Sequence, residues 1–586
     1  MKPSIPIRQK PSAPLAGAPE LFSPLVFWIS GAALVAAVFA VYSPALDFQF
    51  ILDDHRFVND PRVQSYGHLW DYFANYVWAQ IPGGPSSFYR PLFVLWVRLN
   101  FILSEMSPWG WHLLSIAKHV FVAVLLGLLA WKLLRDRTAA LLAAGLFALH
   151  PAHTESVAWV TVPDPLMSAA VLGALLLYLK YASNFSVDSQ SPGESARRKS
   201  RKGNRTQAEA RPSVGWLIAA VATCLAALLA KETAIVLPVI IFALAIILPC
   251  QEQAVAAPAK ETTARGAPET FRSRLVYAVR QTIPFLCVTA VYLLLRLNAL
   301  GGRLGALTQH LPWSTVILSW PATLWFYVKV LIWPVRLRAF ADPSQIDTFS
   351  VRGVLLPGLA VCCAGAIFGS ALFWAWKKAR DLPPRDEAGV KCALLLGTLL
   401  LVLPLLPALN LNALNPGDFL HGRYTYLPSA GLMLLLATGW HLAGKSRAAL
   451  LFPGAFVMVA FAVLTVQQEA AWKDDLTVFT VAHQVAPHNE PVAQNLARAH
   501  VQVALKLDED GRCNEAMPVF EQVTQQYPED WYAWAGLGDC YVQLKDLPRA
   551  EQSLRRAAEL SHEPRVAQQW QQVRAKMGMA ASEPPK

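Results

Sequence analysis

Residues 111–137 read WHLLSIAKHVFVAVLLGLLAWKLLRDR, and this stretch decides the fold class. It is a mainly apolar run that closes on the basic residues Arg135 and Arg137. A helix of ~20 apolar residues crosses the ~30 Å hydrocarbon core of a bilayer. Cytoplasmic loops next to such helices carry an excess of Lys and Arg. We therefore interpret residues 111–134 as a membrane span that ends at the cytoplasmic face.

The whole chain falls into two parts of different composition. Of the 586 residues of the chain, 54% are hydrophobic and only 16% are charged, with a net charge of +11. Apolar runs of spanning length recur up to about residue 466, and a polar segment follows. This pattern excludes a soluble globular enzyme and a disordered chain. It predicts an all-α protein with a cytoplasmic tail at 1–24, a polytopic membrane helix bundle at 25–466 and a soluble α-solenoid at 467–580.

The positions of Lys and Arg orient the predicted spans. The basic loops at 197–205, 377–380 and 445–447 are placed on the cytoplasmic side together with the N-terminal tail. About eleven spans satisfy this constraint, at about 25–43, 111–134, 138–149, 164–181, 214–230, 234–249, 275–297, 353–376, 390–408, 425–443 and 448–466. The loop at 44–110 and the C-terminal segment are then expected outside the cytoplasm.

The segment 315–335 is ambiguous as a span. It is apolar, but it is rich in Trp and contains Pro321 and Lys329, a composition that also suits a helix lying in the membrane interface. Counting it as a crossing would place the basic loop at 377–380 outside. We therefore interpret it as interfacial.

The C-terminal segment carries the pattern of a tetratricopeptide repeat. Trp534, Leu537, Gly538 and Tyr541 match the first helix of this repeat of 34 residues, W-x2-L-G-x2-Y. Positions of the second helix and of preceding repeats are matched by Ala550, Leu554, Ala557, Ala516, Phe520, Phe479 and Ala482. Two interpretations remain open: an array without a ligand, or one whose groove binds substrate or partner.

The eight cysteines do not form a disulfide scaffold or a recognisable zinc motif. Six of them lie in or next to apolar runs, where they are expected to be packing residues. Cys513 and Cys540 stand in the soluble segment, and an oxidising compartment would allow them to form a bridge.

Two acidic residues follow the first span in the sequence QFILDDHRF. Asp53 and Asp54 are expected at the outer membrane surface, where a charged residue is a functional candidate. The loop continues to YRPLFVLWVRLNF, in which Arg90, Arg98 and Asn100 argue for a helix lying along the membrane. A solvated acid is the alternative for either Asp alone.

The connection at 149–169, LHPAHTESVAWVTVPDPLMSA, contains His150, His153, Glu155 and Asp164. The spacing HxxHxE is loose for a divalent metal, so hydrogen-bonding or helix-capping histidines are favoured. No cofactor is predicted, and a divalent metal is left open.

Two further groups of polar residues are expected at the same face. Lys231 and Glu232 separate two apolar runs, as a neutralised pair in a turn or as a phosphate contact. Arg423 and Tyr424 lie in NPGDFLHGRYTYLPSAG at the start of a late span. Because its planar fork can bind phosphate at two points, an arginine beside aromatic rings suits an anionic headgroup.

The order of these motifs resembles a known family. An acidic pair after the first span, YRPL, HPAHTESVAW, AKE, HGRYTYLPS and tetratricopeptide repeats are similar to the transmembrane-and-tetratricopeptide O-mannosyltransferases and their bacterial relatives. The resemblance covers nearly the whole chain. It implies the membrane fold of the C-type glycosyltransferases, which take sugar from a polyprenyl-phosphate carrier.

The resemblance also implies roles for individual residues. Asp53 matches the first acid of the family's outer-loop motif, a catalytic base, with Asp54 as its neighbour. Arg423 matches an arginine near the carrier phosphate, and Asp164 the acid that opens a span. His421 stands where relatives often carry Glu. Candidate substrate- or phosphate-binding residues are thus Arg90, His150, His153, Glu155, Asp164, Lys231, Arg423 and Tyr424.

The leading hypothesis is a glycosyltransferase that moves a sugar, mannose by resemblance, from a polyprenyl-phosphate carrier to a protein or glycan hydroxyl. We expect it in a bacterial inner membrane, in contact with lipids, with loop and repeats in the periplasm. No nucleotide-sugar DxD motif, phosphate loop or nucleic-acid partner is indicated. The alternative is a non-catalytic envelope scaffold that presents its repeats to partners. A transporter is disfavoured, since neither a repeated hydropathy half nor midplane polar residues are evident.

Overall fold

The computed structural model describes residues 23–65, 67–79, 88–184, 214–248, 271–302, 311–335, 346–413, 420–561 and 563–579. The long regular elements in these ranges are helices, as predicted. The chain divides into a membrane unit that ends at Lys473 and a repeat unit that begins at Asp474. The unit boundary lies beyond the predicted residue 466, since buried Trp472 stacks on Trp159 of the membrane unit. The tail at 1–22 and the basic loop at 197–205 lie outside the described residues.

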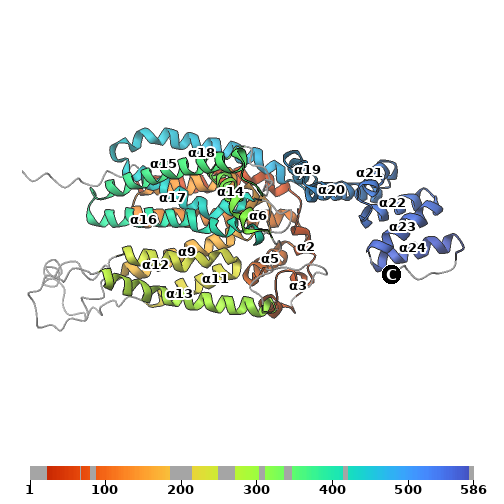
Figure 1. Cartoon of the computed structure of the whole chain (residues 1–586), viewed down its shortest axis with the longest axis horizontal. Helices are drawn as coiled ribbons and strands as arrows, with labels where there is room; N and C mark the ends of the chain where they lie inside the picture. The colour runs from red at the N-terminus through yellow and green to blue at the C-terminus, as the bar shows by residue number, and fades with distance from the viewer. Residues whose placement is uncertain are drawn as a thin grey trace, which may run out of the picture. The chain divides into compact units, whose positions relative to one another are not determined.

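Each predicted span corresponds to a helix of the membrane unit (Figure 1). These helices are α1 (Pro24–Tyr42), α6 (Pro108–Leu134), α7 (Arg137–Ala148), α9 (Asp164–Asn184), α11 (Val214–Ala230), α12 (Leu237–Ile247), α13 (Phe271–Ala299), α15 (Leu356–Ala379), α16 (Pro384–Val402), α17 (Tyr426–Leu442) and α18 (Arg447–Glu469). Eight helices of the described chain are long and apolar enough to cross a membrane, and residues 313–332 form one of them, whereas α7, α11 and α12 are shorter.

Close backbone contact fixes two of these helices against each other. A Cβ atom built on Gly431 of α17 would lie 2.5 Å from the carbonyl oxygen of Gly397 in α16. Only a glycine leaves this space, so the two backbones pack directly, as small residues allow in membrane bundles. By contrast, none of the most apolar window of Val351–Ala379 is buried, which suits a face turned to lipid.

The connecting segments gather at one end of the membrane unit, which we call the loop end. It is formed by residues 48–65, 67–79, 88–107 and 149–163, with short helices α2 (Asp54–Val58), α3 (Pro61–Gln64), α4 (Leu69–Ala74), α5 (Pro91–Ser104) and α8 (Thr154–Ala158). Figure 1 shows α2, α3 and α5 at this end. The short α5 buries Arg98 and Asn100, as expected of a helix that does not cross.

Helix α14 (Trp313–Ile332) has both of its ends at the loop end. Before its N-terminus, the Leu311 amide donates to Asn412 Oδ1 at 2.8 Å. At its C-terminus, His150 Nε2 donates to the Leu331 carbonyl at 3.1 Å. Asn412 follows α16 and His150 follows α7, and both of these helices end at this face. These two contacts favour the interfacial interpretation of residues 315–335.

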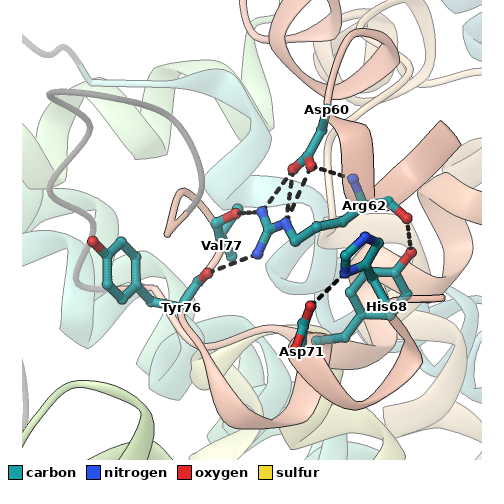
Figure 2. A network of polar contacts seen from close by, with 7 residues as sticks. Asp60, Arg62, His68, Asp71, Tyr76 and Val77 are labelled. Atoms are coloured by element: carbon teal, nitrogen blue, oxygen red, sulfur yellow. Dashed lines mark hydrogen bonds and ion pairs between the residues drawn. The ribbon is translucent and has the colours of Figure 1, made fainter. Parts of the chain in front are cut away.

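The loop at 48–107 is held by a buried arginine (Figure 2). The Arg62 guanidinium lies 2.6 Å from Asp60 Oδ2, and both side chains are at most 1% exposed. The same guanidinium donates to the carbonyls of Tyr76 and Val77. A second pair in the loop, His68 and Asp71, has an N–O distance of 2.6 Å and is more than a third exposed.

The repeat unit is an array of antiparallel helix pairs, which confirms the predicted tetratricopeptide fold. Its helices are α19 (Asp475–Val485), α20 (Glu490–Glu509), α21 (Cys513–Gln526), α22 (Trp531–Gln543), α23 (Leu547–Ser561) and α24 (Pro564–Lys576). A Cβ atom on Gly536 would lie 2.4 Å from the Phe520 ring, and one on Gly538 would lie 2.6 Å from Leu554. Small residues thus admit the large side chains of neighbouring helices.

We predict that both ends of α14 are accessible from one side of the membrane. Single cysteines at Trp313 and Val335, in a background lacking the native cysteines, should react alike with an impermeant thiol reagent. A cysteine at Arg380, after α15, should show the opposite accessibility. Intact cells and inverted vesicles provide the two measurements. Opposite labelling of positions 313 and 335 would contradict the assignment.

We also predict that Arg62→Met destabilises the membrane unit by about 3–5 kcal/mol, because it leaves the Asp60 carboxylate buried without its partner. Asp71→Asn removes the exposed pair of the same loop and should cost less than ~1 kcal/mol. Free energies of unfolding in detergent measure both effects. Equal losses in the two variants would refute the structural role of Arg62.

Candidate functional site

The two acids of the outer loop have different environments. Asp53 is the N-terminal cap of α2 and is partly exposed, whereas Asp54 is fully buried. Thr161 donates to Asp54 Oδ1 through its amide at 3.1 Å and its hydroxyl at 2.5 Å. The Ile51 amide donates to Oδ2 at 3.2 Å. Asp54 therefore joins the loop after α1 to the connection before α9, and Asp53 is the more accessible carboxylate.

Burial raises the pKa of Asp54 from 3.8 to about 7, although the bonds from Thr161 and Ile51 oppose the shift. The direction of this pKa shift determines how Asp54 affects stability at different pH. Because the folded pKa lies above the unfolded one, folding favours the protonated acid, and its contribution to stability falls as the pH rises from about 4 to about 7. A pKa near the working pH is compatible with general-base catalysis, so accessibility and not the pKa distinguishes Asp53 from Asp54.

Two ion pairs join segments distant in sequence. Lys231 Nζ lies 2.6 and 2.7 Å from the carboxylate oxygens of Asp164, the first residue of α9. Arg90 donates to Glu232 at 2.9 and 2.6 Å with two parallel bonds. Lys231 is thus paired with Asp164, and Glu232 is paired with Arg90. The two neighbours do not neutralise each other in a turn.

A third group surrounds Glu155. His421 Nδ1 lies 2.8 Å from Glu155 Oε1, and the Arg423 amide donates to Oε2 at 3.0 Å. Burial alone would raise the pKa of Glu155, but His421 and Arg423 lower it below its usual value. The Arg423 guanidinium lies 4.5 Å from the centre of the Trp159 ring and 3.8 Å from Glu155 through Nε. Glu155 thereby positions the arginine.

Tyr424 connects these groups. Its ring lies 5.0 Å from Lys231 Nζ and 5.7 Å from the Arg423 guanidinium carbon. Such distances permit cation–π attraction. The Tyr424 ring is therefore within cation–π reach of both Lys231 and Arg423.

The histidines of the HPAHTES motif are engaged inside the protein. His150 binds the Leu331 carbonyl, and its Nδ1 accepts from the Ala152 amide at 3.2 Å. His153 Nε2 lies 2.8 Å from Ser429 Oγ. Burial lowers the pKa of His150 to about 4, and it also lowers the pKa of His153 well below its usual value. Their contacts indicate packing and hydrogen-bonding roles rather than phosphate binding.

Sequence reasoning missed Lys118, which lies in the apolar helix α6. Its side chain is buried, and its Nζ has no hydrogen-bond partner among the described residues. It lies 5.3 Å from the Trp96 ring centre, within electrostatic reach of Asp54 and Asp164. The sequence did contain a signal for Lys118. A lysine inside a mainly apolar span is costly, so such a residue is a functional candidate.

These groups form one charged layer at the loop end. Its members are the carboxylates of Asp53, Asp54, Glu155, Asp164 and Glu232 and the cations Lys118, Lys231, Arg90 and Arg423. The layer combines the partly exposed Asp53, adjacent in sequence to the buried Asp54, with cations of which Lys231, Arg90 and Arg423 lie against acidic partners. Such a site can accept a proton and stabilise an anionic leaving group.

Metal ligation has no obvious place in this layer. Within the described ranges, no three His, Cys, Asp or Glu side chains of the membrane unit converge at metal-binding distance.

The chain is similar in sequence to one protein family and to several known proteins. The tetratricopeptide repeat family matches residues 509–576. Mouse protein O-mannosyl-transferase TMTC3 is 26% identical over 557 residues, which are 89% of this chain and 53% of that protein. Fruit-fly protein O-mannosyl-transferase Tmtc1 is 27% identical, covering 77% of this chain and 57% of the relative. The chain spans about half the length of the curated relatives it matches.

A solved structure of the Archaeoglobus fulgidus oligosaccharyltransferase tethered to an acceptor peptide also aligns. It is 14% identical with a TM-score of 0.36, over 84% of this chain and 59% of that one. This value is too low to support an argument. The protein O-mannosyl-transferases of the TMTC group are, however, homologues of this chain over most of its length, which confirms the resemblance found in the sequence.

Proposed function

We propose that the protein is a membrane glycosyltransferase that moves a sugar from a polyprenyl-phosphate carrier to a hydroxyl group, most simply of a protein Ser or Thr. The observation that carries the proposal is the charged layer at the loop end, in which the buried pairs of Lys231 with Asp164 and Arg90 with Glu232 occur beside the segment that bears Asp53 and Asp54. Homology to proteins named O-mannosyl-transferases supports a sugar transfer, with mannose as the donor sugar.

Asp53 is the proposed general base. The acceptor oxygen attacks the anomeric carbon while its proton passes to the Asp53 carboxylate, and the bond to the carrier phosphate breaks. Asp54 supports this residue from the next position through Thr161 and Ile51. It acts by positioning the loop rather than by taking the proton.

The cations are proposed to bind the carrier phosphate. Arg423 carries a planar fork that can bind two phosphate oxygens. Lys118 contributes a charge that lacks a hydrogen-bond partner among the described residues. Arg90 and Lys231, each held by a carboxylate, add fixed positive charge that needs no rearrangement during the reaction.

The cellular arrangement is also a proposal. Basic loops favour a bacterial inner membrane with Asp53 and the repeats in the periplasm. Repeats on the same side would bind a protein acceptor and raise its concentration near the membrane site. A pure scaffold function remains the competing hypothesis, and it requires the acids of the layer to be dispensable.

Incubating the purified protein with a panel of polyprenyl-phosphate sugars and an acceptor protein tests the activity. Consumption of one donor, with sugar recovered on the acceptor, supports the proposal. Consumption of none by a folded protein would favour the scaffold.

We predict that Asp53→Asn lowers the transfer rate by about 100- to 10,000-fold, because it removes the proton acceptor at constant size. Folding should be intact, as judged by thermal unfolding. Asp47→Asn serves as the matched control, since Asp47 is an exposed acid at the start of the same loop. If Asp54→Asn abolishes transfer and Asp53→Asn does not, the base is Asp54.

We predict that Arg423→Lys weakens donor binding by about tenfold or more, because it keeps the charge but loses the two-pronged contact. Binding of the polyprenyl-phosphate sugar can be measured by ligand-induced thermal stabilisation. Arg56→Lys, an exposed arginine of the same end, should leave donor binding unchanged. Equal affinity in the Arg423 variant and the native protein would exclude this contact.

A further inference from the structure

A second group of chemically active side chains lies in the repeat unit, apart from the charged layer. It consists of Asp508 at the end of α20, Cys513 at the start of α21 and Cys540 in α22. The three residues are 7%, 4% and 0% exposed. Their carboxylate and thiol atoms all lie within 4.8 Å of one another.

The two thiols converge on a single oxygen atom. Cys513 Sγ lies 3.0 Å and Cys540 Sγ 3.1 Å from Asp508 Oδ1. The Gln543 amide donates to the same oxygen at 2.8 Å. Thiols are weak hydrogen-bond donors. Two of the three contacts to this oxygen therefore provide little stabilisation for a buried carboxylate.

The surroundings are negative. Asp539 precedes Cys540 in α22 and lies close enough to Asp508 for the two acids to repel each other. In the described part of the chain, no Lys, Arg or His lies within ion-pair distance of Asp508. A buried carboxylate without a cation is costly, and this cost suggests that a cation completes the site.

We propose that Cys513, Cys540 and Asp508 bind a thiophilic divalent ion, with Zn²⁺ as the ion that fits best. Thiolate and carboxylate are ordinary zinc ligands with bonds of about 2.0–2.3 Å. Tetrahedral bonds of this length put ligand atoms about 3.5–3.8 Å apart, so each thiol would move about half an ångström away from Asp508 Oδ1 and stay within the present 4.8 Å limit of the cluster. The two thiols release their protons to solvent on binding, and water or the amide of Gln543 completes the coordination.

The site would join three helices that belong to successive repeats. Repeat arrays are stabilised by interfaces between neighbouring units. An ion held by α20, α21 and α22 adds a cross-link at such an interface, independently of the sugar-transfer reaction.

The test uses the full-length protein in detergent, reduced and treated with chelator, and titrated with Co²⁺ as a spectroscopic substitute. We expect one Co²⁺ per chain, a sulfur-to-metal charge-transfer absorption, and displacement of Co²⁺ by Zn²⁺. Cys513→Ser/Cys540→Ser should abolish the absorption. Asp508→Asn should weaken Co²⁺ binding by at least tenfold while retaining both thiols.

Cys362→Ser/Cys363→Ser is the matched control, because these two cysteines are exposed in α15 and lie outside the cluster. It should keep the absorption. Absence of the absorption in the native protein, or its persistence in Cys513→Ser/Cys540→Ser, would overturn the proposal. So would a Cys513–Cys540 disulfide as the stable form of the purified protein in the presence of Zn²⁺, detected by peptide mass analysis.

Discussion

The cost of placing a charge inside an apolar bundle governs the structure of the membrane unit. A buried ion costs least when a partner of opposite charge and hydrogen bonds replace the lost water. The contact between Lys231 and Asp164 satisfies this condition across 67 positions of sequence. Arg90 with Glu232, and His421 with Glu155, repeat the arrangement. The segments of the loop end are thus assembled by their charges, and the candidate site is a product of that assembly.

The helices could be predicted from sequence because their cause is local. A run of ~20 apolar residues is sufficient to specify a span, and small residues at repeat spacing specified the tetratricopeptide pairs. Proline, lysine and tryptophan indicated that α14 stays at one face. The unit boundary was misplaced by a few residues, because the burial of Trp472 depends on Trp159, which is remote in sequence.

The candidate site was less predictable because its causes are not local. Every acid and cation in the layer except Lys118 was named from the sequence, but no pairing could be. Asp53 and Asp54 are neighbours with the same side chain, and they differ in burial and in the hydrogen bonds that Asp54 accepts from Thr161 and Ile51. The HPAHTES histidines resembled a binding motif, while their partners, Leu331 and Ser429, lie far along the chain.

The contact between Gly431 and Gly397 affects the position of Arg423 as well as the packing of two helices. Arg423 lies just before α17, so its guanidinium is carried by a helix whose distance from α16 is set by these two glycines. A methyl group at either glycine would push α17 outward and move the arginine without touching any charged residue. Inherited or engineered changes at this seam would therefore look like losses of activity, although the defect begins in the spacing of two backbones.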